Sequence, residues 1–193
     1  MSRRVFFSFH YDDVVNFRAN VVRNCGVVFG RDQAGFFDAS VWETAKWTSA
    51  LAIKRLINQA LENTSVTCVL IGSETYNRHW VRYEILKSYE RGNGILGVHI
   101  NGIEDKNGQT AINGPNPFEY LRISPINISM ANPHIAFEWV DQQWREWDGF
   151  RFYRYQPINT QLSHFFSVYD WKVDDGIHNF ANWIETAAKA AGR

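Results

Sequence analysis

The sequence predicts an α/β protein built on a doubly wound, mainly parallel β-sheet. Up to Ile100, short apolar runs alternate with longer segments of helical periodicity, which is the order of parallel strands joined by crossover helices. The clearest apolar run, residues 66–71, is typical of a strand covered on both faces. Because such crossovers are right-handed, the carboxyl ends of the strands should meet at one edge, where these folds bind ligands.

The first unit combines a strand over residues 5–9 with a helix that Asp12 caps and Gly26 ends. The apolar residues of this helix recur at helical spacing, and they are Val14, Phe17 and Val21 with their neighbours Val15 and Val22.

The same alternation places the remaining elements. Further strands are expected at residues 35–40, 66–71, 95–100 and 165–171, and further helices at residues 43–61, 80–92 and 174–190. We expect a single domain over residues 1–193.

Residues 101–165 interrupt the alternation as an insertion before the last strand, rich in Gly, Pro and Asn. Long connections of this kind tend to be functional or disordered. Within the insertion, residues 134–140 and 143–147 flank a polar turn and should pair as a tryptophan-rich hairpin. Its tryptophans should cluster, either pinning the hairpin by cross-strand pairs or offering an aromatic surface to a partner. These tryptophans are Trp139, Trp144 and Trp147.

Composition excludes several classes of function. The chain has 20 basic and 20 acidic residues, so no basic excess indicates a nucleic-acid partner. No apolar run is long enough to cross a bilayer and the start lacks a signal peptide, so we expect a cytoplasmic protein without a membrane partner. Cys25 and Cys68 agree with a reduced compartment, and the histidines lack ligand spacing, so no metal site is expected.

Two patterns are rejected on their context. The glycines of residues 92–97 match the dinucleotide-binding pattern, but they leave a helix and enter a strand, whereas that pattern must open a helix. Asp12 and Asp13 after the first strand resemble a phosphoacceptor site. A receiver domain would also need an aspartate at the end of the strand over residues 66–71, where there is none.

Trp80 and Glu84 form the strongest candidate site. They lie one helical turn apart after a predicted strand, which places an aromatic ring and a carboxylate on one face, at the rim of a crevice. The plainer interpretation is an exposed glutamate on a solvated helix. A single carboxylate is too few for ordinary glycoside hydrolysis. It suffices for cleaving the nicotinamide–ribose bond of NAD, because nicotinamide leaves as a neutral molecule and only the oxocarbenium-like charge needs stabilisation.

These residues carry a resemblance to a known family. The segment from Ser73 through Tyr76 to residues 80–85 resembles the helix motif of TIR domains, with Val81 in place of the usual cysteine. A wider set resembles the TIR-like ThsB proteins of bacterial Thoeris anti-phage systems: residues 5–11, 37–40, 64–72, 80–85, 114–118 and 168–171.

The resemblance implies a flavodoxin-like, TIR-like fold and an enzyme with NAD as its substrate and no metal cofactor. Such proteins answer a phage trigger, which the sequence does not identify. They release nicotinamide and make a cyclic ADP-ribose isomer, a diffusible signal for the NAD-depleting effector ThsA. By position, Glu84 would be catalytic. The residues that would line the nucleotide site are Ser8, Phe9, His10, Tyr11, Asp38 and Trp80.

Two other functions stay open at this point. The protein could be a TIR-like interaction module without turnover, whose tryptophan-rich hairpin binds a partner protein. It could also be a nucleoside-processing transferase that uses a lone glutamate. The resemblance leaves room for a homo-oligomer, although the Arg-Asp…Pro-Gly signature of the assembly loop in many TIR domains is absent.

Overall fold

The computed structural model describes residues 3–25, 49–125, 134–152 and 160–193. Within these residues, four parallel strands form one sheet in the order β1-β2-β3-β8. They are β1 (Val5–Ser8), β2 (Val66–Ile71), β3 (Gly94–His99) and β8 (Val168–Asp170). This arrangement confirms the predicted parallel sheet, while the predicted strand at residues 35–40 and the helix stop at Gly26 lie outside the described residues.

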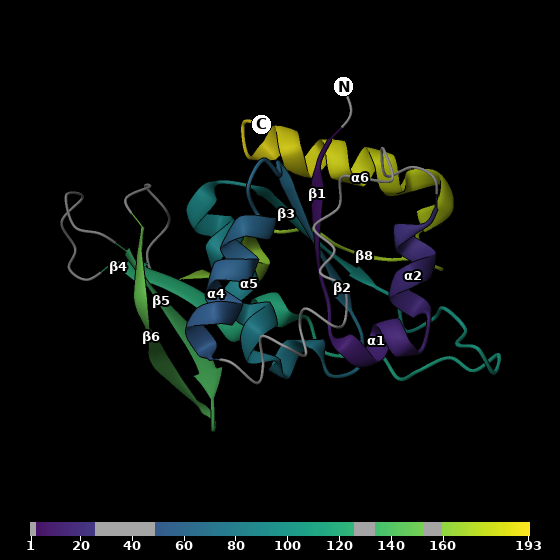
Figure 1. The fold of residues 1–193 in the computed structure, drawn as a ribbon, viewed down its shortest axis with the longest axis horizontal. Helices are drawn as coiled ribbons and strands as arrows, with labels where there is room; N and C mark the ends of the chain where they lie inside the picture. Colours follow the sequence, from purple (N-terminus) through teal and green to yellow (C-terminus); the bar gives the residue numbers. More distant parts are fainter. Residues whose placement is uncertain (1–2, 26–48, 126–133, 153–159) are drawn as a thin grey trace.

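Helices cover both faces of the parallel sheet (Figure 1). They are α2 (Arg18–Arg23) and α6 (Gly176–Ala190) on one face, and α4 (Ala50–Ala60) and α5 (His79–Arg91) on the other. Successive side chains of β1 alternate between the two cores, since Val5 and Phe7 pack with α2 and α6 while Phe6 packs with α4 and α5. Alternation with apolar residues on both faces is what a doubly wound sheet requires.

The helical segment after β1 differs from the prediction. It consists of two short helices, α1 (Tyr11–Val15) and α2, separated at Phe17, whose φ of 64° is left-handed. This break rotates α2, so Phe17 and Val21 are 53% and 41% exposed while Val22 is buried. The prediction of one continuous helix was therefore wrong, and Asp12 lies inside α1 instead of capping it.

The insertion is a second β-sheet, larger than the predicted hairpin. A short 3-10 turn, η2 (Pro117–Tyr120), leads into four antiparallel strands in the order β6-β5-β4-β7. The strands are β4 (Leu121–Pro125), β5 (His134–Val140), β6 (Gln143–Phe152) and β7 (Thr160–Gln161). The β5–β6 hairpin confirms the predicted pairing, and its turn residues Asp141 and Gln142 both have positive φ, as a two-residue hairpin turn requires.

The tryptophans of the hairpin do not form one cluster. Trp139 lies opposite Trp144, with ring centroids 5.3 Å apart. Trp147 lies opposite Ala136 and therefore on the other face of the sheet, where its ring stacks on His79 of α5 at 4.7 Å. Trp139 and Trp144 thus stabilise the hairpin as a cross-strand pair, and Trp147 attaches the antiparallel sheet to α5.

The antiparallel sheet covers the outer side of the α4 and α5 layer (Figure 1). Its side chains Ile123, Trp147 and Phe150 belong to the same buried core as Ile57 of α4 and Ile85 of α5. Helix α5 is consequently enclosed between two sheets, and residues 81–86 are all buried.

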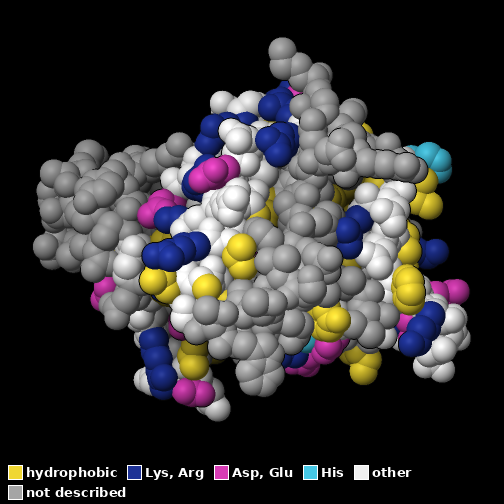
Figure 2. Space-filling model, in the orientation of Figure 1, with side chains coloured by type: hydrophobic (Ala, Val, Ile, Leu, Met, Phe, Trp, Pro, Cys, Tyr) yellow, Lys and Arg dark blue, Asp and Glu magenta, His cyan; other side chains and the backbone are white. Residues whose placement is uncertain are grey.

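The described surface carries mixed charge. On the face seen in Figure 2, Lys and Arg side chains are interspersed with Asp and Glu. Among the described residues, no helix combines the length and the apolar character needed to span a bilayer.

Candidate active site

Glu84 lies under the carboxyl end of the parallel sheet. It projects from the middle of α5 and is only 4% exposed. One oxygen of its carboxylate accepts a hydrogen bond of 2.5 Å from the hydroxyl of Ser8, the last residue of β1. Ser8 itself is 1% exposed, so the pair is held inside the protein. The structure thus joins two residues 76 positions apart that were both predicted to belong to the site.

The environment of Glu84 changes its acidity. Burial raises the pKa of the carboxyl to about 8, and the hydrogen bond from Ser8 acts in the opposite direction because it favours the ionised form. At neutral pH the group therefore holds its proton for most of the time. A carboxyl whose pKa lies near the working pH can both stabilise positive charge and take up a proton.

The predicted place of Glu84 at the rim of a crevice was wrong, because its side chain is buried. Ser8 of β1 holds the carboxyl on the side of α5 that faces the parallel sheet. Arg82, two residues before Glu84 and therefore on a different face of the helix, donates a hydrogen bond of 2.9 Å to Glu138 of β5. The parallel sheet therefore covers the carboxylate, and the insertion attaches to the other side of α5.

Trp80 is the second residue of α5 and is half-buried beside the insertion. Its ring meets the rings of His79 and Tyr83 edge-on, with centroids 4.9 Å and 5.9 Å away. This position agrees with the prediction that Trp80 lines one wall of the nucleotide site. Its contact with a nucleotide remains a prediction.

The residues that follow Ser8 lie at the same sheet edge but differ in environment. Phe9 packs against the core beneath α2 and α6. His10 is half-buried, with its Nδ1 3.5 Å from a carboxylate oxygen of Asp12, and Tyr11 is 40% exposed. The structure thus brings Ser8 to Glu84 and leaves the side chain of Tyr11 open to solvent. Asp38, the remaining predicted site residue, lies outside the described residues.

Asp13 is a second buried carboxyl at this edge, and the sequence interpretation did not assign it to the site. Its side chain is 8% exposed, and the hydroxyl of Thr75 donates to it at 3.4 Å. Burial raises the pKa of Asp13 to about 6, against the opposing effect of nearby Arg18. Its place directly after a strand is a signal that could have identified it. The assignment of Asp12 as a helix cap obscured that signal.

The start of the insertion closes over the end of β2. The amide of Asn101 donates to the carbonyl of Ile112 at 2.7 Å and to the hydroxyl of Ser73 at 3.2 Å. Gly114 is packed so closely that a β-carbon there would lie 2.1 Å from the carbonyl oxygen of Gly72. Only glycine allows this approach, so Gly114 fixes how the segment after β3 covers the sheet edge.

The described residues contain no group of three or more His, Cys, Asp or Glu side chains placed to hold a metal ion. Cys25 and Cys68 are both free thiols, and Cys68 is buried in β2.

The raised pKa of Glu84 predicts that stability depends on pH. The folded state keeps a proton that the unfolded chain releases near the ordinary pKa of 4.5, so stability is full below that value and is lost as pH rises toward about 8. Glu84→Gln cannot ionise and should lose less stability over this range. The gain relative to wild type at about pH 8 should be on the order of 4 kcal/mol in the free energy of unfolding.

Urea unfolding at several pH values between about 5 and 8 measures this difference. Glu62→Gln is the matched control, because Glu62 is exposed and should leave the pH dependence of wild type unchanged. Parallel curves for wild type and Glu84→Gln would show that the carboxyl ionises normally in the fold.

Comparison with known proteins agrees with the geometry. Residues 6–105 match the family described as "Thoeris protein ThsB, TIR-like domain". A curated protein of Bacillus cereus (strain MSX-D12), named "Putative cyclic ADP-D-ribose synthase ThsB1", is 50% identical over 193 residues, covering 95% of this chain and 100% of that protein. With a parallel sheet, a buried glutamate at its edge and these two matches, the chain belongs to the Thoeris ThsB family of TIR-like proteins.

Proposed function

We propose that this protein is an anti-phage enzyme that cleaves the nicotinamide–ribose bond of NAD and closes the remaining ADP-ribose into a cyclic isomer. The observation that carries the proposal is the buried Glu84 carboxyl, held by Ser8 at the ligand-binding edge of a parallel sheet. The name of the Bacillus cereus relative supports the same reaction. In the cell, the product would act from the cytoplasm on an NAD-depleting effector of the ThsA type.

The reaction needs little besides a positioned carboxylate. The bond between nicotinamide and ribose breaks with its electron pair going to the nitrogen, so nicotinamide leaves neutral and the ribose carbon becomes cationic. A hydroxyl of the same molecule then attacks that carbon and loses a proton. Ionised Glu84 would stabilise the cationic carbon and accept the proton, which a group with a pKa of about 8 does well.

Substrate binding would prepare Glu84 for this role. The nicotinamide ring of NAD is positively charged, and a cation near a carboxyl favours the ionised form. Bound NAD would therefore draw the proton from a side chain that holds it in the free protein. When nicotinamide leaves, that charge is lost and the carboxylate again favours a proton, which the attacking hydroxyl supplies.

Ring closure requires that water be kept from the cationic carbon, because hydrolysis would give open ADP-ribose. The burial of Ser8 and Glu84 and the closing segment from Asn101 to Gly114 favour such exclusion.

Product analysis by mass spectrometry tests the proposal. The protein, incubated with NAD and lysate of phage-infected cells, should release nicotinamide and a nucleotide with the mass of ADP-ribose less one water. Nicotinamide with open ADP-ribose alone would indicate a hydrolase. No turnover with lysates from several phages would favour the non-catalytic interaction module.

Ser8→Ala tests how the carboxylate is positioned. Hydrogen bonds to charged groups contribute about 1.5–3 kcal/mol, so loss of the Ser8 hydroxyl should disfavour ionised Glu84 and lower kcat/KM at neutral pH roughly tenfold or more. The rise of kcat/KM with pH should move to higher pH, because that rise reports the free-enzyme pKa of the essential carboxyl. Ser163→Ala, which alters a half-buried serine of the 3-10 turn before β8, serves as the control. A fall in rate without a shift of the pH curve would mean that Ser8 contacts substrate instead.

A further inference from the structure

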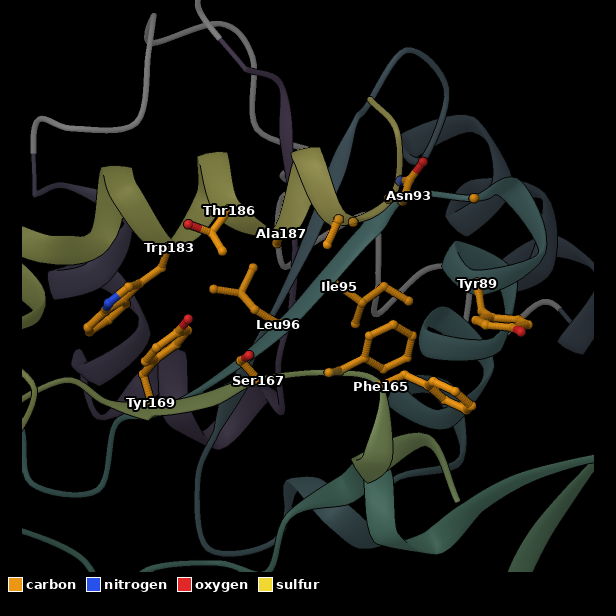
Figure 3. A pocket seen from close by; sticks show the side chains of 15 residues that line it. Tyr89, Asn93, Ile95, Leu96, Phe165, Ser167, Tyr169, Trp183, Thr186 and Ala187 are labelled. Carbon is orange, nitrogen blue, oxygen red and sulfur yellow. The ribbon is translucent and has the colours of Figure 1, made fainter. Parts of the chain in front are cut away.

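A cavity of about 290 Å³ lies away from Glu84, beside the first half of β3. Its walls come from β3, from α6 and from the segment that leads into β8. Figure 3 shows Tyr169 and Trp183 at one end, Phe165 toward the other, and Ile95 and Leu96 of β3 between them. The rings of Tyr169 and Trp183 are parallel within 1°, with centroids 4.3 Å apart.

The edge of β3 is open at this cavity. Strand β8 pairs only with residues 97–99 of β3, so the first half of the strand has a neighbour only on its β2 side. In a parallel strand, alternate residues direct both N–H and C=O to the same side. Gly94 donates to Ser65 on the β2 side at 2.9 Å, and Gly97 donates to Ser167 on the β8 side at 3.0 Å. The N–H and C=O of Ile95 therefore point to the side on which β8 has not yet begun.

These two backbone groups form a buried donor and acceptor side by side. Ile95 is 4% exposed, and among the described residues neither the β8 ladder nor another backbone hydrogen bond reaches its N–H and C=O on that side. Buried backbone groups are almost always paired. A pair of this kind in an aromatic-lined cavity is typical of small-molecule sites, which are mostly apolar with a few fixed polar groups.

We propose that this cavity binds a planar heteroaromatic molecule with an acceptor and an N–H donor side by side, as in the carboxamide of nicotinamide or the amino edge of adenine. The acceptor of the ligand accepts a hydrogen bond from the N–H of Ile95, and its donor donates one to the C=O of Ile95. The ring of the ligand packs among the aromatic side chains. An added peptide strand fits less well, because a single residue of open edge offers one pair of ladder hydrogen bonds. The volume also suits a ring better than a chain.

Matched ligand pairs test the recognition. Nicotinamide and 9-methyladenine are compared by titration calorimetry with methyl nicotinate and N6,N6,9-trimethyladenine, which keep the ring and lose the donor. At least one of the two ligands that carry the donor should bind saturably. The matched compound without the donor should bind about tenfold more weakly or worse, because the buried C=O of Ile95 then stays unpaired. The pair that shows this difference in affinity identifies whether the ligand is of the nicotinamide type or of the adenine type.

A matched pair of variants tests the location. Ala190 of α6 is exposed and lines the cavity, so Ala190→Trp should fill the mouth without entering the core and weaken binding about tenfold or more. Ala181 is exposed on the same helix and does not line the cavity, so Ala181→Trp should bind as wild type does. Thermal unfolding confirms that both variants fold. Absence of binding by both nicotinamide and 9-methyladenine, or binding that Ala190→Trp leaves unchanged, would overturn the proposal.

Discussion

Glu84→Gln should lower nicotinamide release from NAD by about 10²–10³-fold or more while leaving the protein folded. Glutamine has the shape of glutamic acid and can still accept the hydrogen bond from Ser8, but it cannot become negative when the ribose carbon becomes positive. Because burial keeps Glu84 largely protonated in the free protein, the neutral amide resembles the resting state of this side chain. The substitution therefore removes the ionised form required by the reaction and little else.

The measurement is nicotinamide release by chromatography in a preparation that is active with wild-type protein, beside Glu62→Gln as the surface control. Glu84→Asp adds a second test, since it keeps the charge but withdraws it by one methylene. It should retain more activity than Glu84→Gln yet less than wild type. Full activity of Glu84→Gln, with the same cyclic product, would remove Glu84 from the mechanism and leave the function to another group, of which Asp13 is the nearest in kind.

Those parts of the fold that depend on local pattern could be predicted from the sequence. Strands β2 and β3 and the helix carrying Glu84 follow from apolar runs and helical spacing, and the β5–β6 hairpin follows from two β-like runs around a polar turn. The environment of Glu84 could not be predicted in this way. It depends on the contact with Ser8, which lies 76 positions away on β1 of the parallel sheet.

The same reasoning separates the residues of the candidate site. Glu84 stands in a recognisable motif, and Ser8 ends a clear strand, so both could be named before their hydrogen bond was seen. Asp13 was missed because its burial depends on close packing beside Gly72, which has no periodic signal. Pattern thus locates the edge of the sheet, and tertiary packing decides which side chains are dry enough to have shifted pKa values.

Arg82→Ala should destabilise the protein by about 3–5 kcal/mol, because it removes one partner of a largely buried ion pair. The guanidinium of Arg82 donates to Glu138 at 2.9 Å, to the carbonyl of Tyr76 at 2.9 Å and to the carbonyl of Trp139 at 3.2 Å. Its side chain is 5% exposed and that of Glu138 is 21% exposed. The variant would leave these acceptors unpaired at the junction between α5 and the antiparallel sheet.

Urea unfolding compares this variant with Arg55→Ala, in which an exposed arginine of α4 is removed and the cost should stay within about 0.5 kcal/mol. Adding Glu138→Gln to Arg82→Ala should recover part of the loss, because the unpaired charge then disappears. Because Arg82 and Glu84 lie on different faces of α5, the stability curve of Arg82→Ala between about pH 5 and 8 should keep the slope of wild type. A cost no larger than that of Arg55→Ala would show that apolar packing through Trp147 and Phe150 alone holds the antiparallel sheet on α5.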